Sequence, residues 1–304
     1  MQSSNSNSPL SSLEPGPKSN LPKRKFEYQS ESKPAPFNKF FLDWLQVQER
    51  DLEELKSMVK THSESTRQLQ ELVDRVMTHY DEFYRARSES IKENVLLVLN
   101  PDWLSKLEDA FLWLGGWRPT TAVHLLYSKA GLQFEARLSE LLSGVNSDDL
   151  SNLSPSQLVR VDELQRQTIH QERKLTEILA SHQETMADSS MVELSENYTE
   201  LKRDAESAAR KSDRVDSVKD RVDSALAPKE HGLEDILRKA DDLRLKTLKS
   251  VVDILTPIQA VHFLIADTQL HLRVHEWGKL KDEDAKSSKE ARGFVGPGGP
   301  QPSP

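Results

Sequence analysis

The stretch Thr256-Pro257-Ile258-Gln259 indicates a helical fold, because it has the features of a helix N-terminus in the right order. Thr256 suits the N-cap position, Pro257 the first helical position and Gln259 the third. The threonine hydroxyl can accept from an unpaired backbone N–H, and the glutamine can reach back to the cap. Ser154-Pro155-Ser156-Gln157 repeats the pattern, and Asn100-Pro101-Asp102 is a similar start without the glutamine. Each of these prolines predicts the beginning of a helix.

Residues that interrupt helices are sparse in the middle of the chain. From Phe37 to Asp282 there are five prolines, at 101, 119, 155, 228 and 257, and six glycines, at 115, 116, 131, 144, 232 and 278. This spacing favours long helices over many short strands, and no alternating strand pattern competes. We therefore predict an all-α fold, with a single multi-helix bundle over residues 37–282 and disordered N- and C-terminal tails.

Apolar residues recur at helical spacing throughout this region. The predicted helices cover residues 40–55, 69–83, 104–114, 119–130, 132–142, 155–182, 201–224, 233–255 and 257–280. We expect the third to end at Gly115-Gly116 and the fourth at Gly131, since glycine readily takes the left-handed backbone that stops a helix. Segment 201–224 alternates in charge and has few large apolar residues, which predicts a solvated helix.

The two ends of the chain differ in composition from its middle. Residues 1–36 are rich in Ser, Asn and Pro, which predicts a disordered arm, and the tail at 283–304 is also expected to be disordered. Within the arm, Lys23, Arg24 and Lys25 form a short basic cluster after Pro22 and are candidate nuclear-import residues. The alternative is an incidental charge cluster in a solvated tail.

Overall composition excludes several classes of protein. The net charge of −8 argues against a general nucleic-acid binder, which would present a basic surface. No apolar run approaches the roughly 18 to 20 residues that span a bilayer, and the first residues lack the apolar core of a signal peptide. The chain has no cysteine, which removes disulfides, thiolate zinc sites and cysteine nucleophiles and agrees with a reducing interior.

The segment Phe111-Leu112-Trp113-Leu114-Gly115-Gly116-Trp117-Arg118-Pro119 is the first candidate site. Its double glycine permits a sharp turn, and its tryptophans are large apolar anchors. One interpretation is a docking groove, in which Arg118 is free to bind a carboxylate of a partner. The other is a tight corner between helices with Trp113 and Trp117 in the core, which is the usual place of aromatic residues at helical spacing.

His271 and His275 are the second candidate site, four residues apart on one helix face. A zinc site would need further ligands, and Glu276 points about 100° away around the helix. Either imidazole could be an axial ligand of haem, but both cannot bind one iron from opposite faces because they are a single turn apart. One histidine would bind iron, or two chains would share one haem. The third interpretation is a pair of interface residues packed beside Trp277.

Motifs of enzymes are missing from the sequence. There is no glycine-rich phosphate loop, no nucleophile elbow and no HExxH zinc motif. Glu53-Glu54 and Asp241-Asp242 are most simply interpreted as solvated helix faces. We therefore expect no catalytic residues and no metal site, and a metalloenzyme would require stoichiometric zinc.

Several segments together resemble the plant delay-of-germination (DOG) domain, which is shared by seed-dormancy regulators and the C-terminal region of TGA-type bZIP transcription factors. The matching segments are Phe41-Leu42-Asp43-Trp44-Leu45, Trp113 to Pro119, Leu153 to Leu158, Ala240 to Arg244 with Thr247-Leu248, Ile254 to Ala260, and His271 to Gly278. The last segment is similar to the dormancy branch in particular. The resemblance covers about residues 37–282.

The resemblance implies a non-enzymatic regulatory domain of a plant nucleus or cytoplasm. In the dormancy branch such proteins engage type 2C protein phosphatases in abscisic-acid signalling and bind haem, which implies haem at His271 and His275. No basic region with leucine heptads precedes the domain in this sequence, so the DNA-reading part of TGA factors is not expected. The long arm leaves room for another branch, such as the pollen-aperture proteins.

The leading hypothesis is an interaction protein whose partner-binding residues are Trp113, Trp117, Arg118 and Trp277. The second is a transcriptional regulator that binds DNA directly or through a TGA-type bZIP partner. The acidic net charge argues against direct DNA binding, although the family implies it. Homodimer formation stays open.

Overall fold

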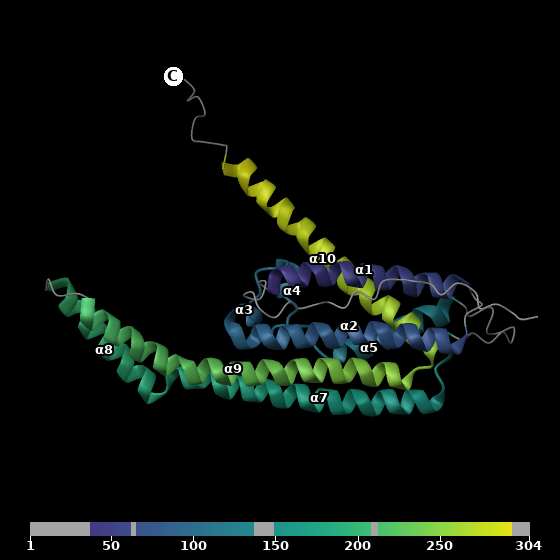
Figure 1. The fold of residues 1–304 in the computed structure, drawn as a ribbon, viewed down its shortest axis with the longest axis horizontal. Helices are drawn as coiled ribbons and strands as arrows, with labels where there is room; N and C mark the ends of the chain where they lie inside the picture. Colours follow the sequence, from purple (N-terminus) through teal and green to yellow (C-terminus); the bar gives the residue numbers. More distant parts are fainter. Residues whose placement is uncertain (1–36, 62–64, 137–148, 208–211, 294–304) are drawn as a thin grey trace, which may run out of the picture. The chain divides into compact units, whose positions relative to one another are not determined.

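The protein is described by a computed structural model, which covers residues 37–61, 65–136, 149–207 and 212–293. Its elements are α1 (Phe37–Thr61), α2 (Thr66–Glu93), α3 (Val95–Leu99), α4 (Lys106–Asp109), α5 (Thr120–Ala136), η1 (Leu150–Asn152), α7 (Pro155–Glu184), η2 (Thr185–Ala187), α8 (Ser189–Ser207), α9 (Ser212–Ile254) and α10 (Pro257–Gly293) (Figure 1). The predicted all-α fold is confirmed, since the only strand-like pairing in the described ranges is an isolated bridge between Trp113 and Gly116. Lys23, Arg24 and Lys25 lie outside the described residues.

Two of the predicted helix starts are confirmed in detail. Ser154 and Gln157 form a capping box at the start of α7, with Pro155 at the first helical position. At the start of α10, Gln259 Oε1 accepts from Thr256 N at 3.1 Å, and Thr256 Oγ1 accepts from Gln259 N at 3.4 Å. These bonds satisfy donors that a helix start leaves unpaired.

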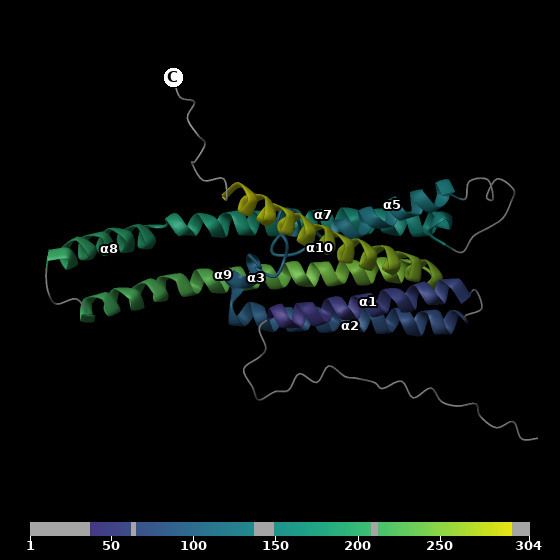
Figure 2. The ribbon, with the colours of Figure 1, turned by 90° about the horizontal axis from the view of Figure 1, so that it is seen from above.

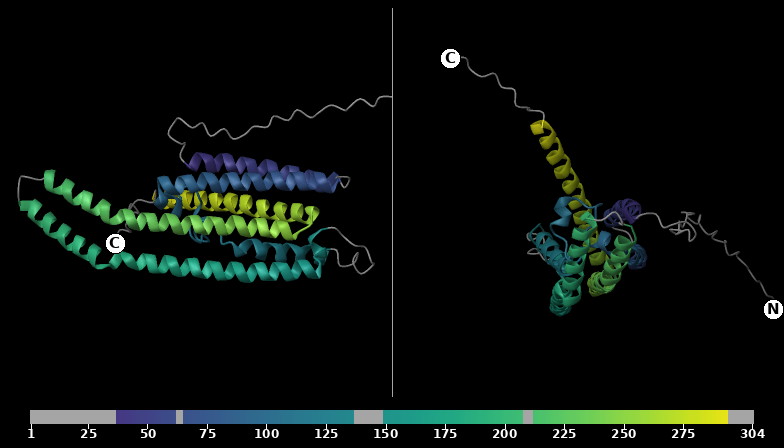
Figure 3. Two further views of the ribbon diagram at one scale, coloured as in Figure 1. Left: turned by 60° about the horizontal axis from the view of Figure 1, so that its bottom comes forward. Right: turned by 90° about the vertical axis from the view of Figure 1, so that its left-hand side faces the viewer.

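The long helices lie against one another in pairs. α1 packs against α2 and α10, and α9 packs against α2 and α7; α8 lies beside the first part of α9 (Figures 2 and 3). The main core contains side chains that are completely or almost completely buried, among them Leu55, Val76, Leu126 and Phe263. Burying each such side chain stabilises the fold by about 1.5–3 kcal/mol, so the apolar helix faces hold the bundle together.

The helix predicted over residues 104–114 is wrong in extent. Only α4 is helical there, after an N-cap at Ser105, and the start predicted at Pro101 does not occur. The carbonyls of Trp113 and Leu114 accept from the Arg244 side chain instead of from helix amides. A distant side chain therefore replaces the helical hydrogen bonds of this segment.

Other helices run further than predicted. α5 continues through Gly131, because only Leu114 and Gly115 have a positive φ in the described chain and Gly131 therefore makes no left-handed stop. α10 continues to Gly293, so the first part of the tail expected from residue 283 is helical. α9 begins at Ser212 and contains Pro228, and the predicted solvated helix at 201–224 is divided between α8 and α9.

Candidate functional site

The segment between α4 and α5 makes a two-residue turn. Trp113 N donates to Gly116 O at 2.7 Å, and Gly116 N donates to Trp113 O at 3.2 Å. The two central residues are left-handed, with φ of 49° at Leu114 and 67° at Gly115. This is the backbone of a type I′ turn, which favours glycine and is uncommon for leucine. A Cβ at Gly115 would lie 2.8 Å from Val98 O, so the position also needs glycine for close approach.

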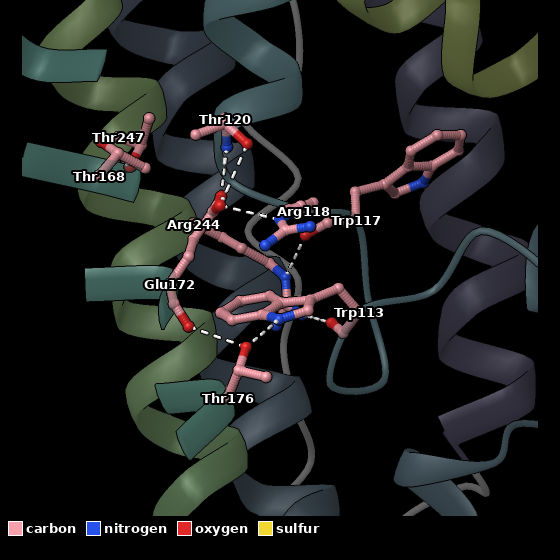
Figure 4. Close-up of polar contacts among 9 residues, drawn as sticks. All are labelled: Trp113, Trp117, Arg118, Thr120, Thr168, Glu172, Thr176, Arg244 and Thr247. Carbon is pink, nitrogen blue, oxygen red and sulfur yellow. Dashed lines mark hydrogen bonds and ion pairs between the residues drawn. The ribbon is translucent and has the colours of Figure 1, made fainter. Parts of the chain in front are cut away.

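Two buried arginines bind the carbonyls of this turn. Arg87 Nη2 donates to Gly115 O at 2.6 Å, and Arg244 donates to the carbonyls of Trp113, Leu114 and Trp117, the last at 2.6 Å from Nε. Figure 4 shows Arg244 with Trp113 and Trp117. Asp241 lies between the two arginines, 2.8 Å from Arg87 Nε and 2.5 Å from Arg244 Nη1. We call Arg87, Asp241 and Arg244 the arginine clamp. Burial lowers the pKa of Arg244 from its ordinary value, although Asp241 opposes the shift.

The prediction of a solvated Asp241-Asp242 pair is wrong for its first member. Asp241 is 4% exposed and belongs to the arginine clamp, whereas Asp242 is exposed. A buried carboxylate is stable only with paired charges and hydrogen bonds, and the two guanidinium groups supply both.

The Trp113 side chain is held on three sides. The guanidinium carbon of Arg244 lies 5.4 Å from its ring centroid and that of Arg118 lies 6.0 Å away, which are cation–π distances. Its Nε1 donates to Thr176 Oγ1 of α7 at 3.1 Å. Trp117 points away from Trp113 in Figure 4 and packs against His271 with the two rings tilted, their centroids 4.9 Å apart. Both tryptophans are half-buried by contacts within the chain.

The docking-groove interpretation expected Arg118 to be free, but Arg118 is paired within the chain. Its Nε lies 2.8 Å from Glu172 Oε2, although half of its side chain is exposed. Glu172 is 1% exposed and also accepts from Thr120 N at 2.7 Å, which is the first amide of α5. A carboxylate at a helix N-terminus is favoured by the unpaired amides there. Glu172 thus joins α7 to the start of α5, and Arg118 neutralises the charge of the Glu172 carboxylate.

His275 faces α4 rather than Trp277. Its Nδ1 lies 2.9 Å from Glu108 Oε2 and 3.0 Å from Oε1, and Oε2 also accepts from Ser105 N and Oγ. Burial acts to raise the pKa of Glu108, but the bonds from His275 and Ser105 outweigh it and hold the pKa below its ordinary value. The helices meet closely here, because a Cβ on Gly278 would lie 1.9 Å from Ser105 Oγ.

His271 is connected to a second buried carboxylate. Its Nδ1 lies 3.6 Å from Asp267 Oδ2, which accepts from the Tyr80 hydroxyl at 2.8 Å. Burial, and then the charge of Asp267, raise the pKa of Tyr80 well above its ordinary value. The structure therefore places the two histidines on one helix face, as predicted, but beside different acids, Asp267 for His271 and Glu108 for His275.

A cavity of about 110 Å³ lies beside both histidines, between α1, α2, α10 and the turn. Pockets for drug-sized ligands have volumes of roughly 300–1,000 Å³, so haem does not fit inside this cavity as the side chains lie. In one respect His275 is suited to bind a metal. Its Nδ1 lies beside the Glu108 carboxylate, which leaves Nε2 as the atom that could bind the metal. Across the described residues, no three His, Cys, Asp or Glu side chains gather in a metal-binding group.

Comparison with known proteins identifies the family. The family model described as "Seed dormancy control" matches residues 51–128, which include the turn and Arg87. Protein DOG1-like 3 of Arabidopsis thaliana is 32% identical over 251 residues, covering 80% of this chain and 84% of the relative. The chain belongs to the DOG1 seed-dormancy-control family. Protein DOG1-like 1 of the same plant is also 32% identical, over 79% of this chain and 88% of its own length.

TGA transcription factors are relatives of this DOG1-family chain as well. Transcription factor TGA6 of Arabidopsis thaliana is 31% identical over 224 residues, which cover 73% of this chain and 57% of the factor. The similarity agrees with the resemblance to the C-terminal region of these factors. Among the described helices, none is both long and apolar enough to cross a membrane.

Trp277 differs from the other tryptophans of the DOG1-family candidate site. It is 52% exposed, and Leu280, three residues further along α10, is 54% exposed. No contact of the Trp277 ring with another ring occurs among the described residues, whereas Trp113 and Trp117 are engaged within the chain. Of the four residues predicted to bind partners, Trp277 is therefore the one that the fold leaves available.

Sequence reasoning missed most of the residues that hold the site together. Arg87, Glu172 and Arg244 were not singled out, although Arg244 stands in a matching segment of the family resemblance. Ser105 and Glu108 have the S-x-x-E spacing of a capping box, which could have been recognised. Nothing local marks Arg87 or Glu172 as buried, because their partners are 154 and 54 residues away.

Proposed function

We propose that this DOG1-family chain is a non-enzymatic regulator that acts by binding other proteins in seed dormancy, abscisic-acid or developmental signalling. The half-exposed Trp277 carries the proposal. Large aromatic side chains are enriched among residues that dominate binding energy, and here one stands beside exposed Leu280 on a helix anchored by His275 and Gly278. A rigid anchor of this kind loses little side-chain entropy on binding.

The proposed partner is a type 2C protein phosphatase, the class implied by the dormancy branch. The test is calorimetric titration of a purified plant phosphatase of this class with the wild type and with Trp277→Ala. We expect Trp277→Ala to weaken binding at least about 10-fold, the size of a hot spot. Phe134→Ala is the matched control, since Phe134 is 47% exposed on a different helix, α5, and should bind normally. Equal affinity of Trp277→Ala and wild type would remove Trp277 from the interface.

A transcriptional role through a TGA-type bZIP partner is the second candidate. The similarity to TGA6 over 224 residues favours it, as does the proposed nuclear location. In a gel-shift experiment, the chain alone should not change the mobility of DNA. Added to a complex of a TGA factor with DNA, it should slow the migration of that complex further. A sequence-specific shift by the isolated chain would show direct DNA binding. A pollen-aperture role within the same family is tested by the phenotype of a loss-of-function plant.

Nuclear import through Lys23, Arg24 and Lys25 remains a prediction from the sequence. It is tested with a fluorescent fusion in which all three residues are changed to alanine. Exclusion of the variant from nuclei that accumulate the wild type supports the import role, and equal distribution refutes it.

Haem binding by His271 and His275 also remains a proposal from the family. Because the cavity is too small, binding would require its walls to move. Haem titration followed by absorbance should be run on wild type, His271→Ala and His275→Ala. If the spectra of the variants match that of wild type, the histidines have a structural role only.

A further inference from the structure

The cavity beside the histidines contains an unsatisfied polar side chain. Gln48 of α1 lines it and is 3% exposed, and its Nε2 has no hydrogen-bond partner. An unpaired buried amide group costs about 1–3 kcal/mol, so such groups are rare in folded proteins. The cost falls if a bound molecule supplies the missing hydrogen bond.

The neighbouring hydroxyl determines which atom of Gln48 needs a partner. The Tyr80 hydroxyl group has one proton and can donate it to only one partner. Its oxygen lies 2.8 Å from Asp267 Oδ2 and 3.2 Å from Gln48 Oε1. The proton goes to the carboxylate, because the charge-assisted bond is shorter and stronger. The Gln48 amide is then best turned so that its NH₂ donates to the Tyr80 oxygen, since the two ends of an amide are interchangeable in shape. This orientation presents the Gln48 carbonyl oxygen as an unpaired acceptor.

The rest of the lining combines aromatic and leucine side chains with ionisable groups that are paired within the chain, among them His275 with Glu108. Trp44, Phe83 and Trp103 contribute ring surface, and the nearby guanidinium groups are already bonded to Asp241 and the turn carbonyls. The Asp267 carboxylate next to Tyr80 would repel an anionic ligand. A neutral molecule with an apolar body therefore matches the walls.

The size and access of the cavity limit the ligand further. Its volume of about 110 Å³ compares with roughly 150 Å³ for a dry engineered cavity that binds benzene. Half-buried lining residues such as Leu45, Leu112 and Leu272 give a route of entry that does not require unfolding.

We propose that this cavity binds a small neutral ligand of the phenol or small-alcohol class, which donates one hydrogen bond to Gln48 while its apolar body packs against the aromatic walls. The site is separate from partner docking at Trp277, and its ligand is unrelated to haem. It would let a small metabolite change the stability of the junction between α1, α2 and α10.

The test compares two probes that differ in one hydroxyl group, phenol and toluene, by calorimetry on the full chain. In wild type we expect phenol to bind about 3- to 10-fold more tightly than toluene, the value of one hydrogen bond. In Gln48→Leu this preference should vanish while toluene still binds. Gln46→Leu, at an exposed position of the same helix, should behave as wild type.

Three results would overturn the proposal. In the first, neither probe binds, which means that the cavity holds water only. In the second, wild type binds phenol and toluene equally. In the third, Gln48→Leu still prefers phenol. The side-chain amide resonance of Gln48, followed by NMR during the phenol titration, locates the site independently of the variants. Since Tyr80 keeps its bond to Asp267 in Gln48→Leu, that variant is expected to fold.

Discussion

The side-chain amide of Gln157 donates to the side-chain oxygen of Gln259 at 2.7 Å, joining the capping residues of two helices that start 102 positions apart. Gln157 also donates to Ile254 O at 3.0 Å, and Gln259 Nε2 donates to Asn152 O at 3.2 Å. The starts of α7 and α10 are thus held by one buried network, in which each amide serves its own helix and its neighbour.

Removing either glutamine should therefore destabilise both helix starts. We expect Gln157→Ala and Gln259→Ala each to lower the free energy of unfolding by about 1–3 kcal/mol, because buried partners lose their bonds. The double variant should lose less than the sum of the two, with a coupling of at least about 0.5 kcal/mol. Urea unfolding measures all three variants, and strictly additive losses would show that the two caps act separately.

Arg244→Met should be among the most damaging substitutions in the chain. It leaves Asp241 with one charged partner and removes the Arg244 donor from the carbonyls of Trp113, Leu114 and Trp117, so we expect a loss of about 3–5 kcal/mol in unfolding free energy. Arg238→Met is the control, since its ion pair with Asp235 is exposed and should contribute less than about 1 kcal/mol. Similar losses for the two variants in guanidinium unfolding would contradict a structural role of the arginine clamp.

Gly278→Ala and Gly131→Ala should have opposite effects. A Cβ at Gly278 would lie 1.9 Å from Ser105 Oγ, and the resulting overlap should cost about 1–3 kcal/mol. A Cβ at Gly131 meets nothing within 4 Å, so alanine should stabilise α5 by about 0.5–1 kcal/mol. Thermal unfolding should show a lower Tm for the first variant and a higher one for the second. Ser105→Gly should reduce the cost of Gly278→Ala, which would not happen if the cost were unrelated to this contact.

The Glu108–His275 contact predicts a pH dependence of stability. Because the folded-state pKa of Glu108 lies below its ordinary value of 4.5, its contribution is present above that pH and is lost as the pH falls through the folded-state pKa. Glu108→Gln retains a capping acceptor but cannot ionise. The stability advantage of wild type over Glu108→Gln, measured by urea unfolding, should therefore shrink as the pH falls below the ordinary pKa of 4.5. Glu53→Gln, at an exposed position, should show no such trend, and a constant Glu108 difference would count against the argument.

The helices that were predicted well are those with local signals. Ser154-Pro155-Ser156-Gln157 and Thr256-Pro257-Ile258-Gln259 form their caps between residues three apart, and the amphipathic pattern of α1 and α2 repeats every turn. The stop at Gly131 was not predicted correctly, because a glycine permits a left-handed stop without requiring one. Helix 104–114 was wrong at its C-terminal end, where Arg244, 130 or more residues away, binds the carbonyls of Trp113 and Leu114.

The all-α class, the caps of α7 and α10, the family, and the shared face of His271 and His275 could all be predicted from residue patterns alone. These depend on contacts within a few residues or on residue patterns that related chains share. Tertiary packing sets the rest: Arg87, Asp241 and Arg244 form a buried clamp, Glu108 faces His275, and one end of the Gln48 side-chain amide is left without a partner. A side chain's charge and hydrogen-bonding capacity are written in the sequence, but whether they are satisfied depends on which distant helix packs against it.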